Sequence, residues 1–181
     1  EFRNMLYTAS EHQGPIAIRY PRGNALGIEV DDKFSKVEIG KAEVLCEGDD
    51  ALIVAFGPFA NDALTLAQKL KLEHDIKVTV INARFAKPLD KDLLGRYLPK
   101  FSTICTWEDH CLAGGFGSAI IEFANDAGIA LQGSIKRFGV GDSFVDHASQ
   151  NEQYVTCGYD SDSIKDYILS NYEPKLKVVN S

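Results

Sequence analysis

From residue 41 onward, short apolar runs alternate with longer segments of helical periodicity. ALIVAFG at 51–57 is continuously apolar, as in strands that are buried on both faces of a sheet. In the next segment, FANDALTLAQKLKLEHD, apolar residues recur at spacings of three and four, which is typical of a helix. Strands that alternate with helices predict a mostly parallel sheet with helices on both faces. The predicted fold class is therefore a three-layer α/β domain.

The same pattern predicts the other elements of this domain. We expect strands at 41–48, 76–83, 102–109 and 135–142, and helices at 59–75, 90–98, 114–128 and 159–172. Asp90 is the predicted N-cap of the second helix, because its carboxylate can accept a backbone N–H of the first turn. Gly128 is expected just after the third helix, and a further helix is expected to begin at Ser149.

The first part of the chain does not fit this alternation. FRNMLYTASEH at 2–12 has helical spacing, and IAIRY at 16–20 resembles a strand that Pro21 ends. Residues 24–37 lack periodicity and predict an interdomain linker. We therefore expect three parts: the end of a preceding domain at 1–23, a linker at 24–37, and the α/β domain at 38–181. The chain begins with Glu, which favours a fragment or a processed chain.

Two arginines lie at the carboxyl end of the predicted strand at 16–20. Open α/β sheets bind ligands at such ends, and a guanidinium can hold a phosphate or carboxylate by two parallel hydrogen bonds. Arg19 and Arg22 are therefore candidates for an anion site. The alternative is an ordinary surface ion pair with Asp or Glu.

Composition excludes several classes of partner. A net charge of −7 and the lack of any basic stripe argue against nucleic acid, and no apolar run is long enough to span a membrane. The four cysteines form no CxxC pair, and no signal peptide is recognisable. We therefore expect reduced thiols, no metal site and a cytoplasmic location.

Three further features have residue types that could take part in binding or catalysis. The helix start at Gly114–Gly117 has only half of a dinucleotide fingerprint, so close packing is favoured over anion binding. Glu108 and Asp109 are adjacent on a predicted strand, so they face opposite sides and do not share a proton; with His110 they suit an interdomain contact or chemistry. His147 could cap a helix, form a pair or contact another domain. No nucleophile–base arrangement, and so no catalytic residue, is predicted.

Several strings, in order, resemble the 1-deoxy-D-xylulose-5-phosphate synthases. They cover nearly the whole chain and include MLYTASEHQGPIAIRYPRGN, VEIGKAEVL, VINARFAKPLD, WEDHCLAGGFGSAIIEF, GVGDSFVDHASQNEQ and CGYDSDSI. The resemblance implies that 1–23 end a pyrimidine-binding domain and that 38–181 form a transketolase-type C-terminal domain. One departure is that Glu108-Asp109-His110 stands where the family is expected to have Glu-Glu-Asn.

The resemblance also implies a function. Enzymes of this family use thiamine diphosphate and Mg²⁺ to condense pyruvate with D-glyceraldehyde 3-phosphate, and they act as homodimers. By this resemblance Arg22 would bind the acceptor phosphate, whereas Arg19 would be structural. The family's cofactor motif, catalytic histidines and activating glutamate belong to earlier domains, so this chain alone is expected to be inactive, with a role in packing and dimer contact.

Two alternatives stay open at this point. The same fold would serve a transketolase or the β subunit of a 2-oxo acid dehydrogenase. A stand-alone, non-catalytic interaction module is the third hypothesis.

Overall fold

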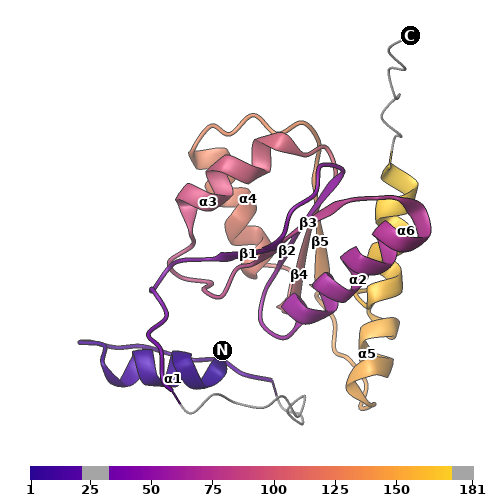
Figure 1. Ribbon diagram of the computed structural model, residues 1–181. Helices are drawn as coiled ribbons and strands as arrows, with labels where there is room; N and C mark the ends of the chain where they lie inside the picture. Colours follow the sequence, from indigo (N-terminus) through magenta and orange to yellow (C-terminus); the bar gives the residue numbers. More distant parts are fainter. Residues whose placement is uncertain (22–32, 173–181) are drawn as a thin grey trace.

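The computed structural model describes residues 1–21 and 33–172, and its main body is a sheet between two helical layers (Figure 1). The sheet has five strands in the order β1-β3-β2-β4-β5. Their bounds are Glu43–Cys46 for β1, Ala51–Ala55 for β2, Val78–Asn82 for β3, Ile104–Cys111 for β4 and Ile135–Val140 for β5. The edge strand β1 is antiparallel to β3, and every other pair is parallel. The predicted mostly parallel α/β fold is confirmed.

Helices cover both faces of the sheet (Figure 1). Their bounds are Phe59–His74 for α2, Lys91–Tyr97 for α3, Phe116–Asp126 for α4, Gln150–Thr156 for α5 and Ser161–Asn171 for α6, with a 3-10 turn η1 at Leu98–Lys100. Alternate residues of β2 point into two separate cores: Ile53 packs with α2 and α6, and Leu52 packs with α3 and α4. The continuous apolar character of ALIVAFG is thereby explained, because both faces of this strand are buried.

Side chains fix the helix starts that the sequence predicts. The Asp90 carboxylate accepts the backbone N–H of Leu93 at 3.0 Å and begins α3. Ser149 and Glu152 form a capping box at α5, and Asp160 caps α6. Gly128 follows α4 with a φ of 63°, a left-handed conformation that glycine adopts without steric cost.

The amino-terminal segment forms one helix, α1, at Phe2–Ser10. Contacts join it to the residues that follow the undescribed part: Thr8 Oγ1 accepts the N–H of Val37 at 2.8 Å, and Lys36 pairs with Glu11 at 3.3 Å. The helix predicted at 2–12 is confirmed, but the strand predicted at 16–20 is wrong, because residues 15–21 have no regular structure. A strand needs a neighbour to pair its backbone groups, and none lies beside this segment among the described residues.

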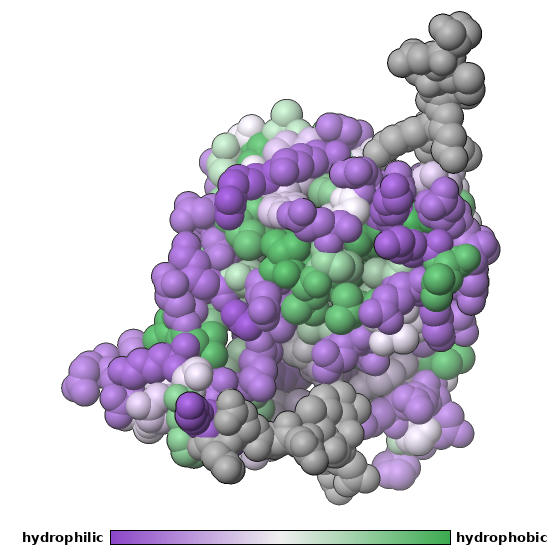
Figure 2. Space-filling model, viewed as in Figure 1, coloured by the Kyte–Doolittle hydropathy of each residue, from purple (hydrophilic) through white to green (hydrophobic). Residues whose placement is uncertain are grey.

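Hydrophobic residues show at the middle of the face seen in Figure 2, and hydrophilic residues surround them. None of the helices in the described ranges is long and apolar enough to cross a membrane.

Candidate functional site

The carboxyl end of β4 is built around a buried carboxylate. Glu108 is fully buried, and its two oxygens accept the backbone N–H groups of Phe116 at 2.5 Å and Gly117 at 2.8 Å. These are orphan donors of the first turn of α4, and a negative charge is favourable there. The chain's own carboxylate therefore occupies the helix start that was considered as an anion site.

Glycines allow this close approach of α4 to the strand. A Cβ on Gly117 would lie 2.4 Å from Thr106 Oγ1 and 2.9 Å from Glu108 Oε1, and a Cβ on Gly115 would lie 2.4 Å from Glu108 Oε2. No side chain fits at such distances. The close packing predicted for the glycine-rich helix start is confirmed.

Asp109 and His110, at the same end of β4, contact other parts of the protein. Asp109 points to the opposite side of the sheet from Glu108, as predicted, and accepts the Tyr159 hydroxyl at 3.1 Å. The His110 ring stacks on Phe56 at 5.5 Å between centroids, and its Nδ1 lies 3.1 Å from Glu108 Oε2. Glu108, Asp109 and His110 thus connect the carboxyl end of β4 to residues on both faces of the sheet.

Burial sets the ionisation of the Glu108 carboxyl. Desolvation raises its pKa, and the N–H groups of Gly117 and Phe116 and the positive charges of Arg137 and Arg19 act against that rise. The pKa of Glu108 is raised overall, so the folded protein stabilises the charged carboxylate less well than water does. Sequence reasoning missed the capping role of Glu108. The signal was present, because Ile104, Thr106 and Glu108 alternate onto the face that α4 covers.

Arg19 meets this strand end from the amino-terminal segment. Its guanidinium Nη2 donates to the backbone carbonyl of Asp109 at 3.1 Å, across 90 positions of sequence. The structural contact predicted for Arg19 is therefore present, although its acceptor is a backbone carbonyl and not an acidic side chain. Arg22, the predicted phosphate ligand, lies outside the described residues.

A second contact joins the amino-terminal segment to the sheet at β3. Arg84 Nε donates to the Glu1 carboxylate at 2.6 Å, and its Nη2 donates to Glu43. The Asn82 side-chain amide also donates to Glu1, at 3.0 Å. Arg84 belongs to the RFAKPLD string, so this string has a visible role in holding the two parts of the chain together.

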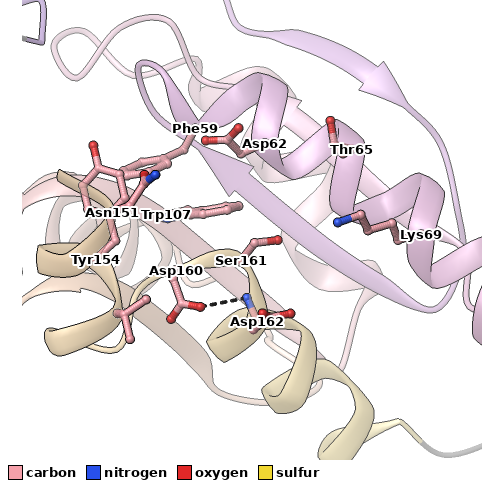
Figure 3. Close-up of a pocket in the computed structure, with 11 residues that line it drawn as sticks. Phe59, Asp62, Thr65, Lys69, Trp107, Asn151, Tyr154, Asp160, Ser161 and Asp162 are labelled. Carbon is pink, nitrogen blue, oxygen red and sulfur yellow. Dashed lines mark hydrogen bonds between the residues drawn. The ribbon is translucent and has the colours of Figure 1, made fainter. Parts of the chain in front are cut away.

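A cleft of about 350 Å³ lies between α2, α5 and α6, on the face of the sheet opposite α4 (Figure 3). Its floor is aromatic, with Phe59 stacked on Trp107 at 4.7 Å between ring centroids. Among the described residues that line it are three carboxylates and one lysine: Asp62, Asp160, Asp162 and Lys69. Because this rim is mostly negative, it is unsuited to a phosphorylated ligand.

The other candidate residues do not come together in a binding or catalytic site within the described ranges. His147 is exposed, two residues before the N-cap of α5. The described ranges contain no group of three His, Cys, Asp or Glu side chains that could hold a metal ion. All four cysteines are free thiols, and Cys105 is fully buried.

A family model described as "Transketolase, C-terminal domain" matches residues 40–164. The chain belongs to the transketolase C-terminal domain family. The matched range holds the whole sheet, the tip of β4 and the glycine-rich start of α4.

Curated relatives support the resemblance drawn from the motifs. The chain is 41% identical over 99% of its length to the 1-deoxy-D-xylulose-5-phosphate synthase of Microcystis aeruginosa, and 45% identical over 91% of its length to that of Syntrophus aciditrophicus. It spans 28% of the former and 25% of the latter. The resemblance to this enzyme family is confirmed.

A solved structure shows the same fold. A chain described as "Split gene transketolase, inactive beta4 tetramer" superposes with a TM-score of 0.75 and 26% identity, over 92% of this chain and 53% of that one. The transketolase-type architecture predicted for the α/β domain agrees with this likeness.

Proposed function

We propose that this chain is the carboxyl-terminal part of a 1-deoxy-D-xylulose-5-phosphate synthase. The parent enzyme would condense pyruvate with D-glyceraldehyde 3-phosphate, with loss of CO₂, to give 1-deoxy-D-xylulose 5-phosphate, a precursor of isoprenoids, thiamine and pyridoxal. The observation that carries the proposal is the identity of 41% to a synthase of that name over 99% of this chain. The position of the six motif strings, in register along the chain, supports it.

The cofactors of the parent enzyme would be thiamine diphosphate and Mg²⁺. The residues that the structure describes do not fit either group, because they include no cluster of metal-ligating side chains and the glycine-rich start of α4 is already occupied by Glu108. The family resemblance assigns the cofactor motif to earlier domains, and we propose that the cofactor site lies there. No catalytic step is assigned to the described residues.

The role proposed for this chain is structural, with one contribution to substrate binding. Residues 1–23 would end the pyrimidine-binding domain, 24–37 would link, and 38–181 would pack against the other domains and contribute to a homodimer. Arg22, three positions after the contact of Arg19 with Asp109, would bind the phosphate of glyceraldehyde 3-phosphate. The four free thiols fit a cytoplasmic location.

A transketolase reaction is the second candidate. The structural likeness to a split-gene transketolase supports it, and it would transfer a two-carbon unit between sugar phosphates without loss of CO₂. A β-subunit role in a 2-oxo acid dehydrogenase would instead require a lipoyl acceptor. If the chain is instead a stand-alone interaction module, no longer chain that contains these residues should be an active enzyme.

One assay separates these candidates. The longest natural chain that contains these residues is given thiamine diphosphate, Mg²⁺ and pyruvate with glyceraldehyde 3-phosphate, and in a parallel sample xylulose 5-phosphate with ribose 5-phosphate. We expect CO₂ and deoxyxylulose phosphate in the first sample and no ketol transfer in the second. The opposite pattern would move the function to transketolase.

A further inference from the structure

We propose that the cleft between α2, α5 and α6 binds a small organic ammonium compound, with the positive charge at Asp62 and a hydrogen-bond acceptor at the indole N–H of Trp107. The inference goes beyond the proposed function, because this cleft lies on the face of the sheet opposite the glycine-rich start of α4. It does not depend on the reaction that the parent enzyme catalyses.

Asp62 is the carboxylate of the cleft that is available to a ligand. Asp160 accepts the backbone N–H of Asp162 at 3.1 Å and also the hydroxyl of Ser163. Asp162 pairs with Lys165 at 2.7 Å. Within residues 1–21 and 33–172, Asp62 takes part in no hydrogen bond or ion pair. Desolvation by its surroundings raises the pKa of Asp62, and a cation beside the carboxylate would offset that cost.

The one lysine that lines the cleft leaves this charge unpaired. Lys69 lies seven positions after Asp62 on α2, which is about two helical turns or roughly 10 Å along the axis. Its charge acts on Asp162 instead, where it lowers the pKa together with Lys165. Three carboxylates against one ammonium give the cleft a negative potential, which attracts a cationic ligand.

Trp107 provides a second, independent sign of a ligand. Its side chain is 1% exposed, and its indole N–H has no acceptor among the described residues. A buried donor without an acceptor is costly and rare in native proteins. Trp107 lines the cleft, and in the view of Figure 3 its ring lies between Asp62 and Asp160. A hydroxyl or carbonyl oxygen of a bound ligand can accept this N–H, whereas a bare metal ion cannot.

The side chains on α5 favour a cation that carries carbon substituents. Tyr154 is half-buried, and its ring meets Phe59 edge to face at 5.2 Å between centroids. An ammonium group beside an aromatic ring is attracted by the ring's negative face. Val155, next to Tyr154 in the same lining, is 65% exposed and offers apolar surface to methyl groups. An alkylated ammonium compound uses both surfaces.

Trp107 is the only tryptophan of the chain, so its indole N–H gives a single resonance in a nuclear magnetic resonance spectrum and reports on the cleft. The isotope-labelled 181-residue chain is titrated with choline, which has a quaternary ammonium and a hydroxyl acceptor, and with its neutral isostere 3,3-dimethylbutanol. Sodium chloride keeps the ionic strength constant. We expect choline to shift the Trp107 resonance saturably, with a Kd on the order of 1 mM, and the isostere to bind at least about fivefold more weakly.

Two variants with the same change of charge locate the site. Asp62→Asn should raise the Kd for choline about fivefold, because it removes the charge and keeps the shape of the side chain. Asp126→Asn, at an exposed position on α4, should leave the Kd within about twofold of the wild type. Calorimetric titration of the longer natural chain with choline repeats the comparison in the parent protein.

The proposal is overturned if choline leaves the Trp107 resonance unmoved, if the isostere binds as strongly, or if a folded Asp62→Asn variant keeps the wild-type Kd. A 181-residue chain that is unfolded by circular dichroism leaves the decision to the longer chain, where the absence of saturable heat overturns the site. Synthase activity without choline binding removes this inference alone. Choline binding by a protein without synthase activity removes only the proposed function.

Discussion

At the scale of single residues, Glu108 shows how burial and hydrogen bonding compete for one carboxylate. It is fully buried, it accepts two N–H groups of α4, and its pKa is raised because desolvation outweighs those bonds. The alternation of β4 was enough to predict that Glu108 and Asp109 face opposite sides. That alternation indicated only the face of Glu108; its bonds to Phe116 and Gly117 could not be predicted, since they depend on the return of α4 to within hydrogen-bond distance of the strand.

Glu108→Gln tests the cap. The amide places an N–H₂ group opposite a backbone N–H, so one buried donor loses its acceptor, and we expect the free energy of unfolding at pH 7 to fall by about 1–3 kcal/mol. The comparison variant is Glu122→Gln. Glu122 lies exposed on α4, the helix that Glu108 caps, and its substitution should change stability by less than about 0.5 kcal/mol. Urea unfolding measures both, and equal effects would remove the cap from the account.

The same pair of proteins tests the pKa direction. A carboxyl whose pKa is raised by folding holds its proton more firmly in the folded state, so its contribution to stability is fully present below the ordinary value of 4.5 and is lost as the pH rises through the folded pKa. The stability difference between the wild type and Glu108→Gln should therefore decrease as the pH is raised from 4 toward neutrality. A difference that increases over this range would contradict the raised pKa.

Arg22 carries the prediction for substrate binding in the complete enzyme. Arg22→Ala removes a charge-assisted contact to the acceptor phosphate, so kcat/KM for glyceraldehyde 3-phosphate should fall by the equivalent of about 2–3 kcal/mol. The KM for pyruvate should change little, because pyruvate has no phosphate. Steady-state kinetics with each substrate varied in turn measure this, and an unchanged kcat/KM would remove Arg22 from the site.

At the scale of elements, the strands and helices from residue 43 onward follow from local patterns. The apolar runs, the helical spacing of residues 59–75 and the predicted N-cap Asp90 agree with the observed elements, and the helix expected to begin at Ser149 does begin there. The strand predicted at 16–20 failed because β pairing is not local. Its apolar residues lack a neighbouring strand, whereas α1 forms its hydrogen bonds within itself.

Two glycine-to-alanine changes test how closely α4 approaches β4. In Gly117→Ala the new Cβ would lie 2.4 Å from Thr106 Oγ1, so we expect a loss of about 1–3 kcal/mol in the free energy of unfolding. In Gly95→Ala, within α3, the new Cβ would meet no atom within 4 Å beyond its chain neighbours and the helix's own backbone, so the change should stabilise the chain by about 0.5–1 kcal/mol. Thermal or urea unfolding of both variants gives the signs, and a tolerated Gly117→Ala would contradict the close packing.

At the scale of the whole molecule, the amino-terminal segment has an apolar side that the described residues leave uncovered. Phe2, Leu6, Ile16 and Tyr20 are each between 41% and 67% exposed, and the rings of Phe2 and Tyr20 lie 5.1 Å apart. The curated relatives extend well beyond this chain, which spans 28% of the Microcystis enzyme. A longer parent chain would have residues available to cover this side.

Hydrogen exchange would reveal such a cover. We expect backbone amides of residues 2–20 to exchange at least about tenfold more slowly in the longer natural chain than in the 181-residue chain. Amides of β2, which is buried on both faces here, serve as the internal reference and should exchange alike in both. Equal rates for residues 2–20 would show that this side stays open in the parent protein.

A comparison of product formation shows whether this chain supports a synthase without catalysing by itself. The longer natural chain and the 181-residue chain are each given pyruvate, glyceraldehyde 3-phosphate, thiamine diphosphate and Mg²⁺, and deoxyxylulose phosphate is measured by mass spectrometry. We expect product from the longer chain and none from the 181-residue chain, although circular dichroism should show that the 181-residue chain is folded. Product from the 181-residue chain, or none from the longer one, would contradict it.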